Sequence, residues 1–134
     1  MRRRLRDDQG SITLGLVVLT LALFAAVGLV VDGGAKVRAV QQATRVAAEA
    51  ARAGAQQVNV SGVQTGGVTT LNAVRARSAA QAVLADAGVT GSVTATATQV
   101  RVSASVTRPT VFLGLVGTSS VTGTGSAQAG LTIQ

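Results

Sequence analysis

Residues 12–31 read ITLGLVVLTLALFAAVGLVV and contain no charged side chain. These 20 residues would form a helix about 30 Å long, which is the thickness of the hydrocarbon core of a bilayer. Thirteen of the 20 are Leu, Ile, Val or Phe, and together they favour membrane insertion by about 4 to 8 kcal/mol as an upper bound. The segment therefore predicts a transmembrane helix over residues 11–31, since a helix buried in a soluble core usually has a shorter apolar stretch.

The residues on either side of this apolar segment predict its orientation. A leader of residues 1–10 precedes it and contains four arginines, Arg2, Arg3, Arg4 and Arg6. Because basic residues are retained on the cytoplasmic side, we expect the leader in the cytoplasm and the rest of the chain outside it. Asp32, Gly33 and Gly34 follow the segment, and each glycine costs about 1 kcal/mol in a helix relative to alanine. These three residues therefore predict a bend or a locally melted turn at the membrane edge.

A secretory signal peptide shows the same order of a basic start and an apolar middle. Its apolar region is normally about 7 to 15 residues long, and small residues for cleavage follow that region. In this chain the small-residue stretch at residues 22–25 lies inside the apolar segment instead. Two interpretations stay open: a stable membrane anchor, which the length favours, and an exported soluble or surface-associated module released by signal-peptide cleavage.

Residues 32–57 are expected to extend the helix beyond the membrane, because this stretch is rich in Ala, Gln, Arg and Val and contains no Pro. Small or β-branched side chains recur on one face at helical spacing: Val37, Val40, Thr44, Ala47, Ala51 and Gly54. Such a face lets another backbone approach closely. We predict packing against other helices at four of these positions: Val37, Val40, Ala47 and Ala51. On another face three arginines recur every seven residues and are interpreted as solvated: Arg38, Arg45 and Arg52.

A second, shorter helix is expected in the second half of the chain. Residues 58–68 contain several glycines and are interpreted as a loop. Apolar residues at helical spacing then predict a helix from about residue 70 to residue 87. Its N-cap is expected at Thr69 or Thr70, and Gly88 stands where the C-terminal cap belongs.

The remaining residues predict a β-structure that completes a small module over residues 69–134. Two runs alternate with a period of two, and the phase changes after Gln99, as at a hairpin turn or a bulge. The apolar patch at 109–117 is too short to span a bilayer and is expected either to cap the core or to rest on the membrane surface. Residues 119–129 are interpreted as one strand, a pair of strands or a flexible tail. The predicted fold class is α+β: a long N-terminal transmembrane helix with a helical extension, then a small helix plus an antiparallel β module.

The composition disfavours catalysis. The 134 residues include no His and no Cys, so the usual zinc sites, disulfides and Ser-His-Asp or Cys-His nucleophilic sites have no residues to form from. Among the five carboxylates, only Asp7 and Asp8 are close in sequence. We therefore predict no catalytic residue, no cofactor and no metal site. The net charge of +7 is spread along the chain, and only two residues are aromatic, which disfavours nucleic acid as a partner.

This order of features resembles the TadE/TadG-like proteins of Tad (Flp) pilus systems, and the short TadG-like branch in particular. The resemblance is carried by QGSITLGLVVLTLALFAAVGLVVDGGAKVRAVQQATRVAAEAARAGA at residues 9–55 and, more loosely, by RPTVFLGLVGTSSVTGTGSAQA at residues 108–129. It implies a pilin- or pseudopilin-like protein of the bacterial cytoplasmic (inner) membrane that helps to assemble a pilus or a related secretion apparatus without being an enzyme. Expected partners are other membrane proteins of that machine, the lipid bilayer, and further copies of the chain in an oligomer or filament.

The same resemblance implies a processing site between Gly10 and Ser11, where a prepilin peptidase would remove the basic leader. Pilins and TadE-like proteins carry Glu at the fifth position after the cut, whereas this chain has Gly15. The Pro that is frequent in the apolar helix of the family is also missing here. TadG-like members commonly lack the Glu, so its absence agrees with that branch.

Overall fold

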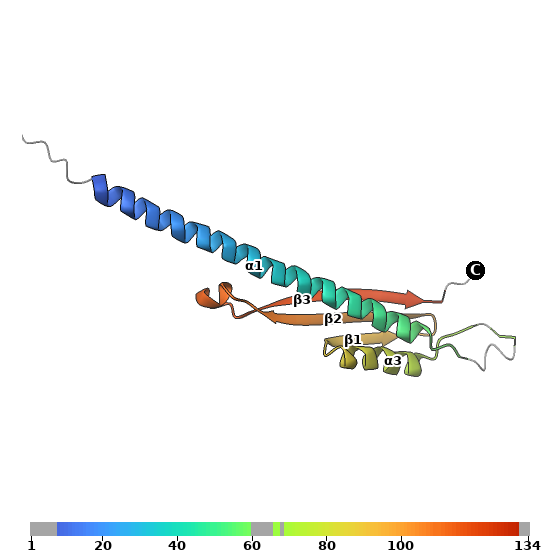
Figure 1. Cartoon of the computed structure of the whole chain (residues 1–134). Coiled ribbons are helices and arrows are strands. Elements are labelled where there is room, and N and C mark those ends of the chain that lie inside the picture. Colours follow the sequence, from blue (N-terminus) through green and yellow to red (C-terminus); the bar gives the residue numbers. More distant parts are fainter. Residues whose placement is uncertain (1–7, 60–65, 68, 132–134) are drawn as a thin grey trace, which may run out of the picture.

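The computed structural model describes residues 8–59, 66–67 and 69–131 (Figure 1). Its longest element is α1 (Asp8–Ala55), a helix of 48 residues whose second half lies along a small α/β layer while its first half extends beyond that layer. The chain continues through α3 (Ala73–Asp86), β1 (Thr90–Ala95), β2 (Gln99–Pro109), a 3₁₀ turn η1 (Leu113–Val116) and β3 (Ser120–Gly130). The predicted α+β class is confirmed: a long N-terminal apolar helix, a small helix and a three-stranded antiparallel sheet.

The sheet has the strand order β1–β2–β3 and is antiparallel throughout. Strands β1 (Thr90–Ala95) and β2 (Gln99–Pro109) form a hairpin in which Thr96 donates its amide to the Gln99 carbonyl at 2.9 Å. This turn explains the change of phase in the sequence and confirms the predicted hairpin. Residues 120–129 of the predicted stretch fall in one strand, β3 (Ser120–Gly130), so the alternatives of a strand pair and a flexible tail are wrong.

The core lies between the sheet and the second half of α1. Alternate side chains of β2 point toward the helix and are buried: Val100, Val102, Ala104 and Val106. The helix meets them with alanines three or four residues apart: Ala39, Ala43, Ala47 and Ala50. Since alanine and valine are small, the helix axis can lie close to the sheet, and a few residues are enough to exclude water between them.

Two glycines of β3 bring the strand into direct contact with the helix backbone. A Cβ atom added at Gly123 would lie 2.8 Å from the Cβ of Ala39, and one added at Gly125 would lie 2.6 Å from the Cα of Thr44. Both distances are shorter than any normal carbon–carbon contact. The absence of a side chain at these two positions is therefore what sets the spacing between β3 and α1.

Helix α3 (Ala73–Asp86) begins three residues later than predicted. Its N-cap is Asn72, whose side chain accepts the Arg75 amide at 3.1 Å, so the expectation of Thr69 or Thr70 is wrong. The reason is the chain that leads into the helix: Asn59 donates its amide to the Thr70 carbonyl, and a β-bridge fixes Leu71 just before the cap. The end of α3 is confirmed, because the following Gly88 has φ +64°, which glycine adopts without strain.

Helix α1 continues without interruption through Asp32, Gly33 and Gly34, so the predicted locally melted turn is wrong. The cost of two glycines is small compared with the cooperativity of a 48-residue helix that tertiary contacts hold on both sides of the junction. Bending at this junction during assembly stays a prediction. The four leader arginines and most of the predicted loop at 58–68 lie outside the described residues.

Candidate functional site

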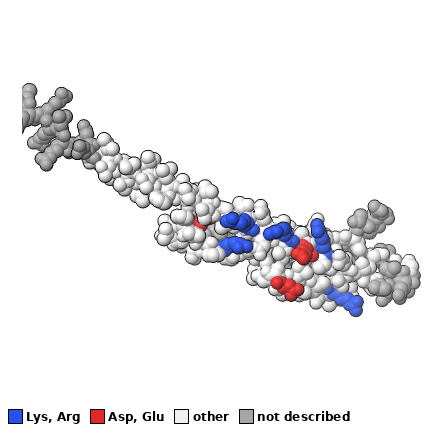
Figure 2. Space-filling view, in the orientation of Figure 1, with Lys and Arg blue, Asp and Glu red and all other residues white. Residues whose placement is uncertain are grey.

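The first half of α1 presents large apolar side chains on all sides. Those from Ile12 to Val31 are between 40% and 75% exposed, and this stretch lies beyond the sheet and α3. Figure 2 shows uncharged surface along this part of the helix, whereas the basic side chains gather over the module. The one hydroxyl near the middle of the segment, that of Thr20, donates to the Leu16 carbonyl at 2.8 Å within the helix. A helix that is apolar all round requires an apolar surrounding, either lipid or protein.

Within the described residues, α1 is the one helix that is long and apolar enough to cross a membrane. Only 6% of the most apolar stretch of α1 is buried, whereas the core helix of a soluble protein is mostly buried. A signal sequence near the N-terminus would meet the same criterion of length and composition. The structure is thus compatible with a single membrane span.

Asp32 forms a clip at the point where the apolar half of α1 ends. Its Oδ1 accepts the backbone N–H of Val111 at 2.9 Å, and its Oδ2 accepts those of Phe112 at 3.0 Å and Leu113 at 2.6 Å. The carboxylate is 1% exposed, and the three amides lead into the short 3₁₀ turn η1 (Leu113–Val116). Amides at the start of a helical turn have no partner within it, so a carboxylate there satisfies them and is itself stabilised by their dipoles.

These hydrogen bonds lower the pKa of Asp32 below its ordinary value of 3.8. The largest effect comes from the Val111 amide, followed by that of Leu113, while burial acts in the opposite direction and the Phe112 amide adds to the lowering. An ionised carboxylate accepts hydrogen bonds on both oxygens, whereas a protonated one must use an oxygen as a donor. The clip therefore depends on the charged form of Asp32.

Lowering the pH is expected to release the clip only in strong acid. Because the pKa of the docked carboxyl is depressed, its contribution is complete above pH 3.8 and is lost as the pH falls through the lowered value. The amide chemical shifts of Val111, Phe112 and Leu113 in isotope-labelled protein measure this directly. They should stay constant from neutral pH down to pH 5 and should change together below 3.8. A shared titration near neutral pH would contradict the proposed charge state.

The side chain of Phe112 packs against Gly28, which lies one helical turn before Asp32 in α1. A Cβ atom at Gly28 would lie 2.6 Å from Cγ and 2.7 Å from Cβ of Phe112, so the ring occupies the space that a side chain would need. The contact forms one wall of a groove of about 560 Å³ between the helix and the η1 turn. Only apolar side chains and glycine line this groove: Phe24, Ala25, Gly28, Leu29, Phe112, Leu113, Leu115 and Val116. The clip and the ring together fix the β2–β3 connection on the apolar half of α1.

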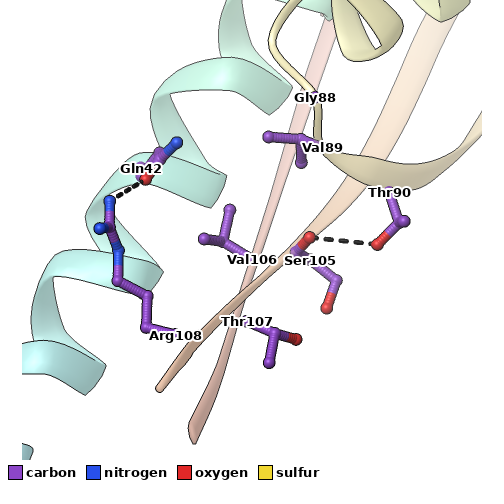
Figure 3. Close-up of a pocket in the computed structure, with 8 residues that line it drawn as sticks. All are labelled: Gln42, Gly88, Val89, Thr90, Ser105, Val106, Thr107 and Arg108. Atoms are coloured by element: carbon purple, nitrogen blue, oxygen red, sulfur yellow. Dashed lines mark hydrogen bonds between the residues drawn. The ribbon is translucent and has the colours of Figure 1, made fainter. Parts of the chain in front are cut away.

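A second hollow, of about 380 Å³, lies between α1, the last residues of β2 and the turn that follows α3 (Figure 3). Arg108 of β2 extends toward α1 and donates to the Gln42 side chain, and the Thr90 hydroxyl donates to the Ser105 carbonyl. The charged group in its lining is the Arg108 guanidinium, and no carboxylate, His or Cys lines it. These contacts join α1 to the sheet and supply no acid–base pair. Among the described residues, no group of three or more potential metal ligands occurs.

The structure separates the residues that the sequence grouped on one small-residue face. Ala47 and Ala51 are buried against the chain's own sheet, whereas Val37 and Val40 are exposed. The buried face is thus rotated toward Ala39, Ala43 and Ala50, which the sequence pattern did not select. Gly10 and Ser11 are exposed in the first turns of α1, far from the module. The sequence predicts a bend at Asp32, and no local signal in it indicates the contact of Asp32 with residues 111–113.

A long helix with an exposed apolar half, joined to a small sheet that covers its other half, defines an α+β protein built on one extended helix. Residues 10–57 match a protein-family model, Tad, which carries the description "Putative Flp pilus-assembly TadE/G-like". The match confirms the predicted resemblance over this segment and ends within two residues of the end of α1. It supports a role connected with pili. Searches among curated proteins and among solved structures gave no significant match.

Proposed function

We propose that this protein is a non-enzymatic, minor-pilin-like structural or assembly component of a Tad/Flp-type pilus or a related secretion apparatus. In this proposal α1 spans the cytoplasmic membrane once, the N-terminus is cytoplasmic and the α/β module is extracytoplasmic. The observation that carries the proposal is the exposed apolar half of α1, which belongs to the segment that matches the pilus-assembly family. An apolar surface of this extent, left uncovered by the described part of the chain, suits lipid and neighbouring transmembrane helices.

The protein would act through contacts of α1 with other helices. Val37, Val40 and Thr44 form an exposed stripe on α1 just beyond the apolar half, and Val40 and Thr44 lie beside the edge strand β3. A neighbouring helix could lie along this face without disturbing the core, because Ala47 and Ala51 already pack inside the module. Expected partners are membrane proteins of the same machine or further copies of the chain.

Two further proposals concern the N-terminal half of α1. Gly10 and Ser11 are exposed, so a membrane peptidase that unwinds the first turn could reach the bond between them. Gly33 and Gly34 would allow α1 to bend once Asp32 releases the β2–β3 connection. The mass of the N-terminal peptide from membrane-extracted protein tests the first proposal: a start at Ser11 supports pilin-type processing, and an intact Met1 supports an uncleaved anchor.

Deletion of the gene is expected to abolish assembled pili or the export that the apparatus supports, and the wild-type gene should restore them. A photo-crosslinking residue at Val37 should then capture another membrane protein of the apparatus or a second copy of the chain. The same residue at Val74 serves as the matched control, because Val74 is 81% exposed and lies on α3, away from this face. Normal pili and export in the deletion strain, with only monomer after crosslinking at Val37, would refute the proposal.

Orientation is tested by single-cysteine variants in intact cells. A membrane-impermeant thiol reagent should label Thr122→Cys on the exposed face of β3 without permeabilisation. It should label Gln9→Cys only after the membrane is opened, because the leader would be cytoplasmic. The reverse pattern would overturn the proposed topology.

The alternative is an exported module released by signal-peptide cleavage. It is favoured by the position of the apolar helix near the N-terminus, where a signal sequence would also lie. Fractionation combined with N-terminal mass measurement separates the two functions. A soluble, extracytoplasmic protein that starts beyond about residue 26 would establish the alternative, whereas a membrane fraction with Met1 or Ser11 at its start supports the anchored protein.

A further inference from the structure

The connection between β2 and β3 presents large apolar side chains that the module does not cover. Residues 110–118 read TVFLGLVGT and carry no charge. Leu115 is 85% exposed and Val116 is 78% exposed, and Val111 is exposed beside them. The connection therefore does not cap the core, which was one of the two roles expected from the sequence.

This connection lies beside the apolar half of α1. Phe112 contacts Gly28, and the groove next to it extends to Phe24 on the helix. At 1.5 Å per residue, Gly28 lies about 6 Å and Phe24 about 12 Å from Asp32 along the axis, within the apolar segment. Figure 1 shows the same arrangement, with the η1 turn at the end of the module that points toward the first half of α1. Any medium that surrounds the last turns of the apolar segment also surrounds residues 111–116.

Backbone amides of the connection have hydrogen-bond acceptors within the protein, as an apolar medium requires. Three of its amides donate to Asp32, and others donate within the connection: Thr110 to Ser119, Leu115 to Phe112, Gly117 to Gly114 and Thr118 to Leu113. The Thr110 hydroxyl also donates, to the Thr118 carbonyl. Irregular backbone can enter the hydrocarbon region only when its polar groups are satisfied internally. In water these groups could bind solvent, so an acidic side chain buried to receive three of them would not be needed.

We propose that residues 110–118 form a second membrane-contact element, which enters the outer leaflet beside α1 and is held there by Asp32. The proposal rests on the proposed membrane anchoring of α1. Lipid is the occupant that fits, because Val111, Leu115 and Val116 continue the apolar surface of the span and the adjoining groove is lined only by apolar side chains and glycine. Exposed basic residues begin just beyond this level, at Lys36, Arg38 and Arg108, where cations meet lipid headgroups.

Such an element would fix the module relative to the membrane. A single helix can rotate and tilt freely in a bilayer, whereas a helix with an apolar side element has one preferred rotation and depth. The faces of α1 that remain free, including Val37 and Val40, would then be presented to partners in a constant direction.

The test uses the absence of cysteine from the chain. Leu115→Cys and Val74→Cys are labelled with the same environment-sensitive fluorophore, and full-length protein is reconstituted at low density into phosphatidylcholine–phosphatidylglycerol vesicles. The two positions are closely matched, since Leu115 is 85% exposed and Val74 is 81% exposed. Lipid-borne nitroxide should quench the label at position 115 severalfold more strongly than at position 74, and aqueous iodide should show the opposite order. Circular dichroism of both labelled proteins should match that of wild type.

A third variant, Leu21→Cys in the middle of the apolar segment, distinguishes the two possible failures. If lipid-borne nitroxide quenches position 21 but iodide quenches position 115 as strongly as position 74, the connection lies in water and this inference is overturned while membrane anchoring stands. If position 21 is also open to iodide, the membrane anchoring itself fails. Protection of position 115 from both quenchers, with disulfide-linked dimers of unlabelled Leu115→Cys, would identify a second copy as the occupant and would also overturn the inference.

Discussion

Replacement of Gly125 by valine is expected to destabilise the α/β module by about 3 kcal/mol, the upper part of the range for overpacked cores. A Cβ atom at this position would lie 2.6 Å from the Cα of Thr44, and helix backbone cannot move aside as the end of a long side chain can. Valine adds two further methyl groups to this contact. Strand β3 must therefore move away from α1, which opens the core that Ala43 and Ala47 share with β2. Thermal and denaturant unfolding of full-length protein in detergent measures the effect.

Ser126→Val is the control for this substitution. It places the same β-branched residue next to Gly125 on the same strand, but on the exposed face of the sheet. It should leave the unfolding midpoint within error of wild type. Gly123→Ala should destabilise in the same direction by about 1 to 3 kcal/mol, because its Cβ would lie 2.8 Å from that of Ala39. Wild-type stability of Gly125→Val would mean that α1 and β3 are not packed as described.

Replacement of Asp32 by asparagine is expected to release the β2–β3 connection while the module stays folded. The amide group keeps the shape of the carboxylate, but one of its two oxygens becomes an NH₂ that faces backbone N–H donors. Val111, Phe112 and Leu113 would then have at most one acceptor in place of two. Hydrogen–deuterium exchange of residues 110–118 should accelerate by about tenfold or more, because local opening replaces the docked state. Exchange within β2 and β3 should change little.

Asp86→Asn provides the matched control, since Asp86 is exposed on α3 and the substitution removes the same charge. It should not alter exchange at residues 110–118. Equal exchange in Asp32→Asn and wild type would show that the three hydrogen bonds do not hold the connection. If the protein acts in pilus assembly as proposed, Asp32→Asn should also complement the deletion strain less well than Asp86→Asn.

Features that depend on neighbouring residues were predictable. The charge-free segment at residues 12–31 identified the apolar helix, the change of phase near Gln99 identified the hairpin, and Gly88 identified the end of α3. Each of these patterns reflects local chemistry: hydrophobic length, alternation across a strand, and the freedom of glycine at positive φ.

Features that depend on distant residues were not predictable. Alanine occurs on several faces of α1 between residues 35 and 55, so periodicity could not reveal that Ala39 and Ala43 face the sheet. The sequence predicts the N-cap of α3 two or three residues too early, because nothing in it indicates the β-bridge at Leu71. Asp32 accepts hydrogen bonds from a backbone segment 79 to 81 residues away, and no local sequence pattern indicates that contact.

The sequence alone determined that this chain has a helix long and apolar enough for a membrane, followed by a small α+β module, because hydrophobic length and side-chain alternation are local properties. Only the tertiary structure decided which face of α1 is buried and where the apolar turn at residues 110–118 is held. The physical reason is that glycines in β3 and a carboxylate in α1 act on backbone far away in the chain, and those contacts exist only after the module has folded onto the helix.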